Sequence, residues 1–273
     1  MEAARMREEW PLVDTHAHVF NADMPLSPDA WRSPEKEARY EDFTRVLDTH
    51  HVPFGVIAAA SMYGDYNGYT LQALDAHPHR LRATVIVKPT IDGTALRDLQ
   101  SRGVVGVRWV WFNQDELPDL HSYEYRAFLR RLADTGLHVQ ILLGGERLDG
   151  VLKTLHNAGV EVVIDHFGFP DPTSGLDCPG FKAAVSAAKR GKAMVKMAAW
   201  HRLEGRGPQL CARLLDTCGP GKLLFGSDWP FLAAAPAYGY AECLDAYLQA
   251  VPDAGIRRAI SETALRYYFW NKR

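Results

Sequence analysis

The feature that most constrains the fold is a regular alternation between short apolar, β-branched runs and longer stretches with helical periodicity. Eight such runs lie along the chain of 273 residues, and each has the length of a buried strand. Successive runs are mostly separated by the length of one crossover helix, as parallel βαβ units require. The runs cover residues 12–20, 55–61, 81–88, 104–111, 138–144, 161–167, 193–199 and 223–227.

Helices are predicted between these runs from their apolar faces and their end signals. Residues 40–47 and 148–155 each place apolar side chains on one face at helical spacing. A helix over 125–132 has Ser122 placed to cap its start and Gly136 placed to end it. Further helices are predicted near residues 210–215, 240–251 and 255–270.

This organisation predicts an α/β fold of the (β/α)8 TIM barrel type, which commonly takes about 250 residues as one domain. An open doubly wound sheet is the alternative, but no glycine-rich nucleotide-binding motif follows any run. No flexible linker divides the chain, so we expect a single barrel domain over residues 1–273. Residues 1–10 are expected to form an N-terminal extension and residues 21–37 an insertion after the first strand.

Composition and charge exclude several classes of partner. A net charge of -2 gives no broad basic surface for nucleic acid, and no apolar run reaches the ~20 residues of a membrane span. The four cysteines show no C-x-x-C spacing, and residues 1–10 show no secretory signal. We therefore expect a cytoplasmic protein with free thiols that binds a small molecule, with a homo-oligomer left open.

Titratable side chains gather at the ends of three predicted strands, where the catalytic groups of a barrel lie. His16 and His18 end the first run, and strand alternation puts them on the same face. His166 ends the sixth run, and Asp228 follows the eighth. Burying these four groups together costs free energy unless they bind a ligand or one another. They also form an acceptable N3O ligand set for zinc.

The motifs around these residues resemble the amidohydrolase superfamily. They read D-T-H-A-H at 14–18, V-I-D-H-F-G at 163–168 and F-G-S-D-W-P at 225–230, and they resemble the "amidohydrolase 2" branch, most closely its 2-pyrone-4,6-dicarboxylate lactonases. The resemblance implies hydrolysis of a lactone, in which Asp228 acts as general base on water. It also implies that the carbonyl is polarised by His16, His18 and His166.

The resemblance leaves the metal and the reaction type open. Metal-binding relatives usually supply a ligand at the carboxyl end of strand five, where this chain is aliphatic, and His138 begins that strand at the opposite end of the barrel. Catalysis without a metal is therefore the favoured hypothesis. The alternative is a mononuclear divalent ion such as zinc, held by His16, His18, His166 and Asp228. The second candidate function is a zinc-dependent non-oxidative decarboxylase, and the third is a barrel that binds a ligand without turnover.

Cationic and polar residues near the strand ends are candidates for substrate binding. Arg108 is the strongest, because a guanidinium inside an apolar run is costly unless it meets an anion. Compared with the pyrone dicarboxylate enzymes, the chain lacks a basic residue within 112–114, a tyrosine on strand five and a histidine at Phe231. We therefore expect a related lactone with fewer charges. The other candidates are Lys196, Arg202, Tyr63, Asn67 and Arg32, with Trp31 as an apolar wall.

Overall fold

All eight predicted runs form strands of one sheet. The computed structural model describes residues 11–171, 173–232 and 234–270, so the expected extension over 1–10 lies outside the described residues. Each strand lies within its predicted run, except that β2 begins one residue earlier. The strands are β1 (Val13–Ala17), β2 (Phe54–Ala58), β3 (Leu81–Val85), β4 (Val104–Val110), β5 (His138–Leu142), β6 (Val162–Ile164), β7 (Met194–Met197) and β8 (Leu223–Phe225).

The sheet is parallel throughout and closes on itself. Its strands follow one another in the order of the sequence, from β1 to β8. Closure takes place just beyond β8, where the backbone N–H of Asp228 donates to the carbonyl of His16 at 2.8 Å. The N–H of His18 donates in turn to the carbonyl of Trp229, also at 2.8 Å. The predicted (β/α)8 barrel is therefore confirmed, and its first and last strands meet at the mouth.

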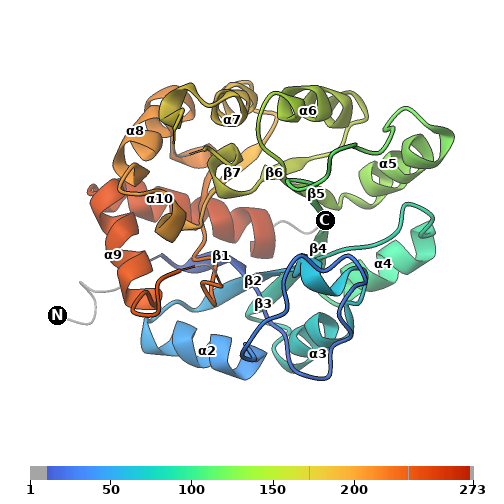
Figure 1. The fold of residues 1–273 in the computed structure, drawn as a ribbon, viewed down its shortest axis with the longest axis horizontal. Coiled ribbons are helices and arrows are strands. Elements are labelled where there is room, and N and C mark those ends of the chain that lie inside the picture. Colours follow the sequence, from blue (N-terminus) through green and yellow to red (C-terminus); the bar gives the residue numbers. More distant parts are fainter. Residues whose placement is uncertain (1–10, 172, 233, 271–273) are drawn as a thin grey trace.

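Helices surround this barrel (Figure 1). The predicted caps are present: the Ser122 hydroxyl accepts from the N–H of Tyr125, and Gly136 ends the helix in the left-handed conformation. Among the described residues, no helix has both the length and the apolar character that crossing a membrane requires. The helices are α2 (Tyr40–Thr49), α3 (Gly68–Ala76), α4 (Gly93–Ser101), α5 (Tyr123–Thr135), α6 (Arg147–Asn157), α7 (Pro179–Lys189), α8 (Gly207–Cys218), α9 (Tyr240–Ala250) and α10 (Ala254–Leu265).

Helix α2 shows how the helices pack on the barrel. Phe43 and Leu47 are fully buried and lie on the face of α2 that meets β2. The contact is close because β2 carries Gly55 there, where a Cβ atom would lie 2.8 Å from the Phe43 ring. A glycine on the strand thus lets an aromatic side chain reach the sheet, and burial of these two side chains stabilises the contact by about 3–6 kcal/mol.

The segment 21–37 after β1 contains no helix or strand and lies beside the barrel mouth. An antiparallel bridge between Phe20 and Ala38 joins its two ends. Its middle is held by the N–H of Ser27, which donates at 2.8 Å to the carbonyl of Met62 in the short 3-10 helix η1 (Ser61–Tyr63). This loop therefore supplies side chains to the mouth of the barrel.

Candidate active site

The carboxyl end of β1 places two imidazoles at the mouth of the barrel, as alternation predicted. His16 is fully buried, and the His18 side chain is 12% exposed. The Nδ1 of His18 lies 2.7 Å from the carbonyl oxygen of Ala58. Because a carbonyl can only accept, this nitrogen carries a proton. When the His18 ring is neutral, its Nε2 therefore faces the cavity as an acceptor.

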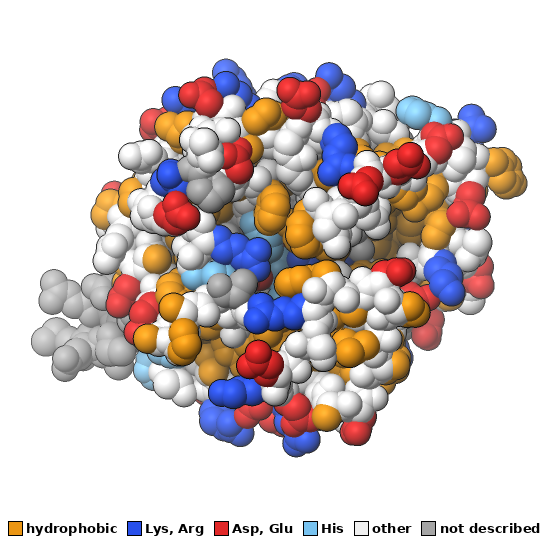
Figure 2. All heavy atoms as spheres, in the orientation of Figure 1, with side chains coloured by type: hydrophobic (Ala, Val, Ile, Leu, Met, Phe, Trp, Pro, Cys, Tyr) orange, Lys and Arg blue, Asp and Glu red, His pale blue; other side chains and the backbone are white. Residues whose placement is uncertain are grey.

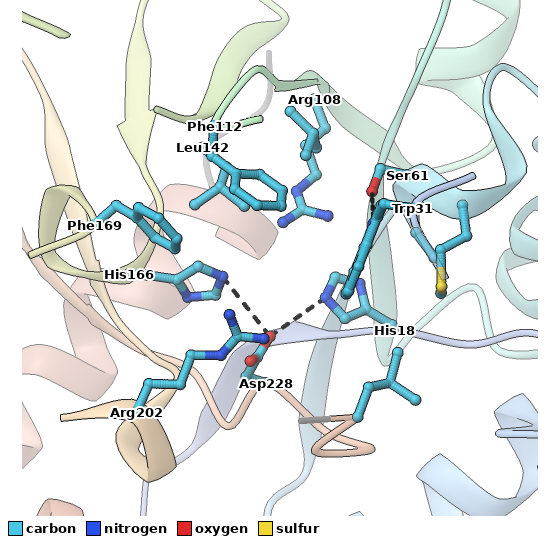
Figure 3. Close-up of a pocket in the computed structure, with 14 residues that line it drawn as sticks. His18, Trp31, Ser61, Arg108, Phe112, Leu142, His166, Phe169, Arg202 and Asp228 are labelled. Carbon is cyan, nitrogen blue, oxygen red and sulfur yellow. Dashed lines mark hydrogen bonds and ion pairs between the residues drawn. The ribbon is translucent and has the colours of Figure 1, made fainter. Parts of the chain in front are cut away.

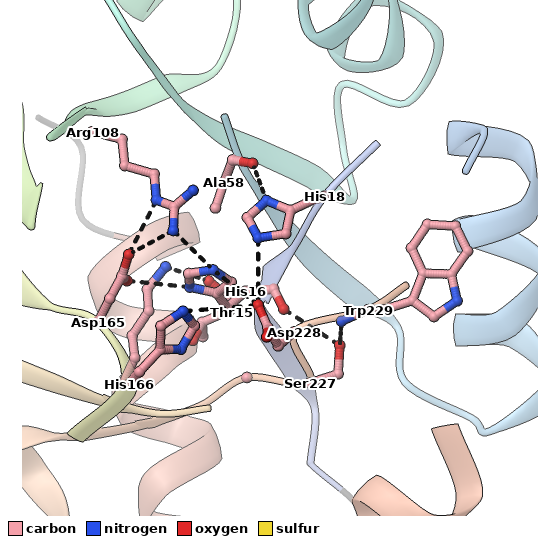
Figure 4. A network of polar contacts seen from close by, with 12 residues as sticks. Thr15, His16, His18, Ala58, Arg108, Asp165, His166, Ser227, Asp228 and Trp229 are labelled. Atoms are coloured by element: carbon pink, nitrogen blue, oxygen red, sulfur yellow. Dashed lines mark hydrogen bonds and ion pairs between the residues drawn. The ribbon is translucent and has the colours of Figure 1, made fainter. Parts of the chain in front are cut away.

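Asp228 is the centre of the site (Figures 3 and 4). Its Oδ1 lies 3.4 Å from the Nε2 of His18, 3.7 Å from that of His16 and 3.8 Å from that of His166. Its Oδ2 lies 3.9 Å from the Nε2 of His201. Burial acts to raise the pKa of Asp228, but His166 and His18 outweigh it and hold the pKa well below its usual range. Asp228 is thus a carboxylate at neutral pH.

The backbone at two of these residues adopts a conformation that residues other than glycine rarely take. Asp228 has a φ of 69° and His166 a φ of 49°. Strained backbone of this kind gathers at functional sites, where the surrounding structure holds it. Gly226 permits the approach of the chain, because a Cβ there would lie 2.6 Å from the Cβ of His16. The two turns bring His166 and Asp228 back toward the cavity after their strands end.

Asp165 supports His16 from inside the barrel (Figure 4). Its Oδ1 lies 3.2 Å from the Nδ1 of His16, and its Oδ2 accepts from the Gln140 side chain at 3.1 Å. Burial acts to raise the pKa of Asp165, but His16 and Arg108 outweigh it and hold this pKa well below its usual value. The carboxylate favours a proton on Nδ1 of His16 and so leaves Nε2 facing Asp228 as an acceptor.

Arg108 is paired with an anion, as expected for a guanidinium inside an apolar run. The anion is the Asp165 carboxylate of the protein and not a substrate group. The Nε and Nη2 of Arg108 lie 3.1 and 3.0 Å from Oδ2 of Asp165. Its Nη1 donates to the carbonyl of Ala59 at 2.7 Å, and its Nη2 lies 3.5 Å from the Nε2 of His16. Since a guanidinium has five N–H groups, these contacts leave one for a ligand.

The buried histidines are neutral at pH 7. Burial lowers the pKa of His166 to about 4, against the opposing attraction of Asp228. Burial also lowers the pKa of His16 well below its usual value, although Asp165 opposes it, and it lowers the pKa of His201. These rings therefore act at neutral pH through hydrogen bonds and lone pairs rather than through positive charge.

Lys196 does not line the cavity, contrary to the expectation that it contacts substrate. It is fully buried inside the barrel, where its Nζ donates to the carbonyl of Thr15 and, at 2.8 Å, to Oε1 of Gln140. Gln140 in turn donates to Asp165. The ammonium group is thus hydrogen-bonded within the protein, and Lys196 belongs to the network below His16.

Three further substrate candidates also lie outside the cavity lining. The Asn67 amide holds the backbone of Ile86, donating to its carbonyl at 2.8 Å and accepting from its N–H at 3.2 Å. Tyr63 is buried and lines a separate cavity beside the segment 21–37. Arg32 follows Trp31, and it is Trp31 that lines the cavity over Asp228. These three positions shape the loops around the site.

The cavity at the barrel mouth has a volume of about 140 Å³ and contains His18, His166, Asp228 and Arg108 in its lining. Figure 2 shows this hollow, with hydrophobic side chains around much of its rim. Arg202 also lines it, as predicted from the sequence, and extends into it from the short helix η4 (Trp200–Arg202) (Figure 3). The cavity therefore combines a carboxylate, two imidazoles, two guanidinium groups and apolar walls.

The sequence interpretation missed three residues of the site: Asp165, Gln140 and His201. Asp165 directly precedes His166, so simple alternation places it on the opposite face, away from the mouth. Gln140 is an uncharged side chain in the middle of an apolar strand. His201 lies in the short helix after β7 rather than at a strand end, and only its proximity to Asp228 identifies it.

Three of the donors around Asp228 fit a mononuclear divalent ion, because among the described residues the ligand atoms of His16, His166 and Asp228 lie within 4.8 Å of one another. Adjacent ligands of a tetrahedral zinc, each about 2.0–2.1 Å from the metal, lie about 3.3 Å apart, close to the spacings around Oδ1 of Asp228. The Nδ1 atoms of His16 and His18 face Asp165 and a backbone carbonyl, the outer contacts that metal-bound histidines usually make. When bound, such an ion would be held by His16, His166 and Asp228, with His18 beside Asp228, and would polarise a carbonyl or acidify a water.

Comparison with known proteins places this architecture among enzymes. A protein from Acinetobacter baumannii described as a probable 2-pyrone-4,6-dicarboxylic acid hydrolase, solved with citric acid bound, is similar in structure, with a TM-score of 0.89 and 28% identity over 94% of this chain and 98% of that chain. The 4-sulfomuconolactone hydrolase of Hydrogenophaga intermedia is 24% identical over 224 residues, which cover 80% of this chain and 74% of that protein.

Another relative and a family model agree with these similarities. The 2-pyrone-4,6-dicarboxylate hydrolase of Comamonas testosteroni is 25% identical over 243 residues, which cover 80% of this chain and 76% of that protein. The model of the amidohydrolase family matches residues 13–270, from the start of β1 to the end of the helical turn after α10. Because that match spans nearly the whole chain, this protein belongs to the amidohydrolase family.

Proposed function

We propose that the protein hydrolyses a lactone, with Asp228 as the general base. The observation that carries this proposal is the convergence of three Nε2 atoms on one oxygen of an ionised, 8% exposed carboxylate in a cavity. A carboxylate within hydrogen-bond reach of a water can take its proton as the water attacks. The similarity to 4-sulfomuconolactone and 2-pyrone-4,6-dicarboxylate hydrolases supports a cyclic ester as the substrate.

The proposed reaction uses Asp228 twice. The carboxylate takes a proton from water as the water oxygen bonds to the lactone carbonyl carbon, which leaves a negative charge on the carbonyl oxygen. The ring C–O bond then breaks, and the leaving oxygen takes the proton from the Asp228 carboxyl. A hydroxy acid is formed, and Asp228 is a carboxylate again.

The hydrogen-bond pattern suggests different roles for the three histidines that were expected to polarise the carbonyl together. His18 places its Nε2 3.4 Å from Oδ1 of Asp228, so we assign it to orienting the attacking water. His166 lines the cavity, and its ring is neutral at pH 7. We assign the carbonyl oxygen to His166 and to the remaining N–H of Arg108, which stabilise the developing negative charge. His16 holds Arg108 and Asp165 in place.

The test is a panel of lactones and carboxylic acids assayed with Asp228→Asn and wild-type protein. Ring opening is followed by absorbance and by proton release, and carbon dioxide is measured in parallel. We expect the wild type to open lactones and Asp228→Asn to be slower by roughly 10²- to 10⁴-fold, because the amide takes no proton. Asp245→Asn, an exposed change on α9, is the matched control and keeps wild-type activity.

The outcomes separate the candidate functions. Full hydrolytic activity in Asp228→Asn would exclude the general-base role. Release of carbon dioxide without ring opening would identify a decarboxylase instead. If neither reaction occurs with any compound of the panel, the protein is a ligand-binding barrel without turnover, and the proposal is wrong.

A further inference from the structure

The charges that line the active-site cavity are few. Among the described residues that form its lining, the charged ones are Asp228, Arg108 and Arg202. Asp228 is the proposed base, and the charge of Arg108 is compensated by the buried Asp165 carboxylate. Arg202 is exposed; its Nε donates to the Nε2 of His201 at 3.3 Å, and no ion pair among the described residues involves it. The cavity therefore offers a substrate one uncompensated positive charge.

The cavity also has an aromatic wall, which is built from Trp31, Phe112 and Phe169. The rings of Trp31 and Phe112 lie 6.2 Å apart edge to face, and those of Phe112 and Phe169 lie 5.4 Å apart. The indole N–H of Trp31 donates to the Ser61 hydroxyl at 3.1 Å, which fixes the orientation of the ring. Figure 3 shows Phe112 and Phe169 on the side of His166 and Trp31 on the side of His18. This wall offers apolar surface and no counterion.

We propose that the substrate is a lactone with a single anionic group, bound by Arg202, and with an apolar face that packs against the aromatic wall. The proposal rests on the lactone hydrolysis proposed above. A guanidinium pairs well with a carboxylate or sulfonate, and the rings of the wall pack on a planar ring. A second carboxylate would lie against the wall without a counterion and would lose hydration without compensation.

Phe112 is the position that selects against a second anion. Phe112 follows Trp111 just after the end of β4, and its ring contacts both of the other rings of the wall. A cationic side chain at this position would supply the missing counterion. Selectivity between singly and doubly charged lactones should therefore depend on Phe112, while affinity for the first anion should depend on Arg202.

The first experiment measures binding, so that it succeeds or fails independently of turnover. Benzoate and isophthalate are planar rings with one and two carboxylates, and their binding is measured by calorimetry. We expect benzoate to bind more tightly than isophthalate. Arg202→Gln should weaken the binding of benzoate by about 10- to 100-fold, because a charged hydrogen bond is lost. Arg206→Gln, which changes a nearby arginine paired with Glu204, is the control and leaves benzoate binding unchanged.

The second experiment measures turnover of 2-pyrones with one carboxylate, with two, and with a methyl group instead. Arg202→Gln is expected to raise KM for the monocarboxylate about 10-fold or more. The KM for the methyl compound, which has no anionic group, is expected to change much less. Phe112→Arg is expected to shift preference toward the dicarboxylate. If isophthalate binds as well as benzoate, if neither binds, or if Arg202→Gln leaves benzoate binding intact, the proposed substrate class is wrong. If binding follows expectation but no pyrone opens, the lactonase function fails and the binding preference stands.

Discussion

Asp14 and Ser227 join the first and last strands of the barrel through two hydrogen bonds. The backbone N–H of Ser227 donates to Oδ1 of Asp14 at 2.9 Å, and its hydroxyl donates to Oδ2 at 2.6 Å. Tyr240 donates to the same carboxylate at 3.1 Å, and the N–H of His16 does so as well. Because Ser227 precedes Asp228, this contact positions the proposed base relative to β1.

We predict that Ser227→Ala lowers the free energy of unfolding by about 1–3 kcal/mol, because it removes one hydrogen bond to the buried Asp14 carboxylate and leaves the N–H of Trp229 without its hydroxyl partner. Hydrolytic kcat should fall as well, since Asp228 loses its support. Urea unfolding measures the first effect. Ser101→Ala, an exposed serine whose hydroxyl bonds to the Asp98 carbonyl, should change stability by less than about 0.5 kcal/mol. Equal stability of the two variants would contradict the prediction.

Arg108→Met tests whether Asp165 needs its internal counterion. We predict a loss of about 3–5 kcal/mol in the free energy of unfolding, because a buried carboxylate loses its paired charge. The double variant with Asp165→Asn should recover part of this loss, which a double-mutant cycle measures. Arg102→Met removes the exposed pair with Asp75 and should cost about 0–1 kcal/mol. Additive effects of the Arg108 and Asp165 changes would refute the internal pairing.

The fold and the core of the site were predictable because their signals are local. Apolar runs fix the strands, and Ser122 and Gly136 mark the ends of a helix by their own backbone and side-chain chemistry. His16 and Asp228 could be placed together because the carboxyl ends of all strands in a parallel barrel share one face. That argument needs only the order of the strands and their direction.

The depth of a side chain within the barrel was not predictable, because it depends on strand tilt and stagger. Lys196 and Arg202 are six positions apart in the sequence, yet Lys196 is fully buried and Arg202 is exposed. The internal partner of Arg108 was also hidden, since Asp165 lies 57 positions away in the sequence. The same holds for Asn67, whose amide is used by the backbone of Ile86.

Lys196 predicts a pH dependence of stability. Burial lowers its pKa from 10.5 to about 7, although Asp165 opposes this shift. Between these two pH values the unfolded chain binds more protons than the folded protein, so the free energy of unfolding rises with pH. We predict that the stability of the wild type relative to Lys196→Met increases between pH 7 and about pH 10, by up to about 1.4 kcal/mol per pH unit.

Urea unfolding at several pH values measures this difference, because the contributions of all other titrating groups cancel between the two proteins. The control is Lys153→Met, which removes an exposed lysine paired with Asp149 on α6. Its stability relative to the wild type should not change with pH over the same range. Parallel pH curves for the wild type and Lys196→Met would show that Lys196 titrates normally.

The last prediction concerns the metal. No described side chain at the carboxyl end of β5 carries a ligand group, since this end reads Ile141 and Leu142, and Gln140 below them is bonded to Asp165. Asp228 is already a carboxylate at neutral pH, and the N–H of Arg108 is available to the carbonyl oxygen, so the proposed proton transfers need only residues of the chain.

We therefore predict full hydrolytic activity after exhaustive chelation, with metal content and kcat measured on the same sample. Because His16, His166 and Asp228 also fit a divalent ion, zinc is then added back and its binding is followed by the thermal midpoint. Stoichiometric zinc whose removal abolishes turnover, and whose return restores it, would overturn the prediction and make this cluster a catalytic metal site.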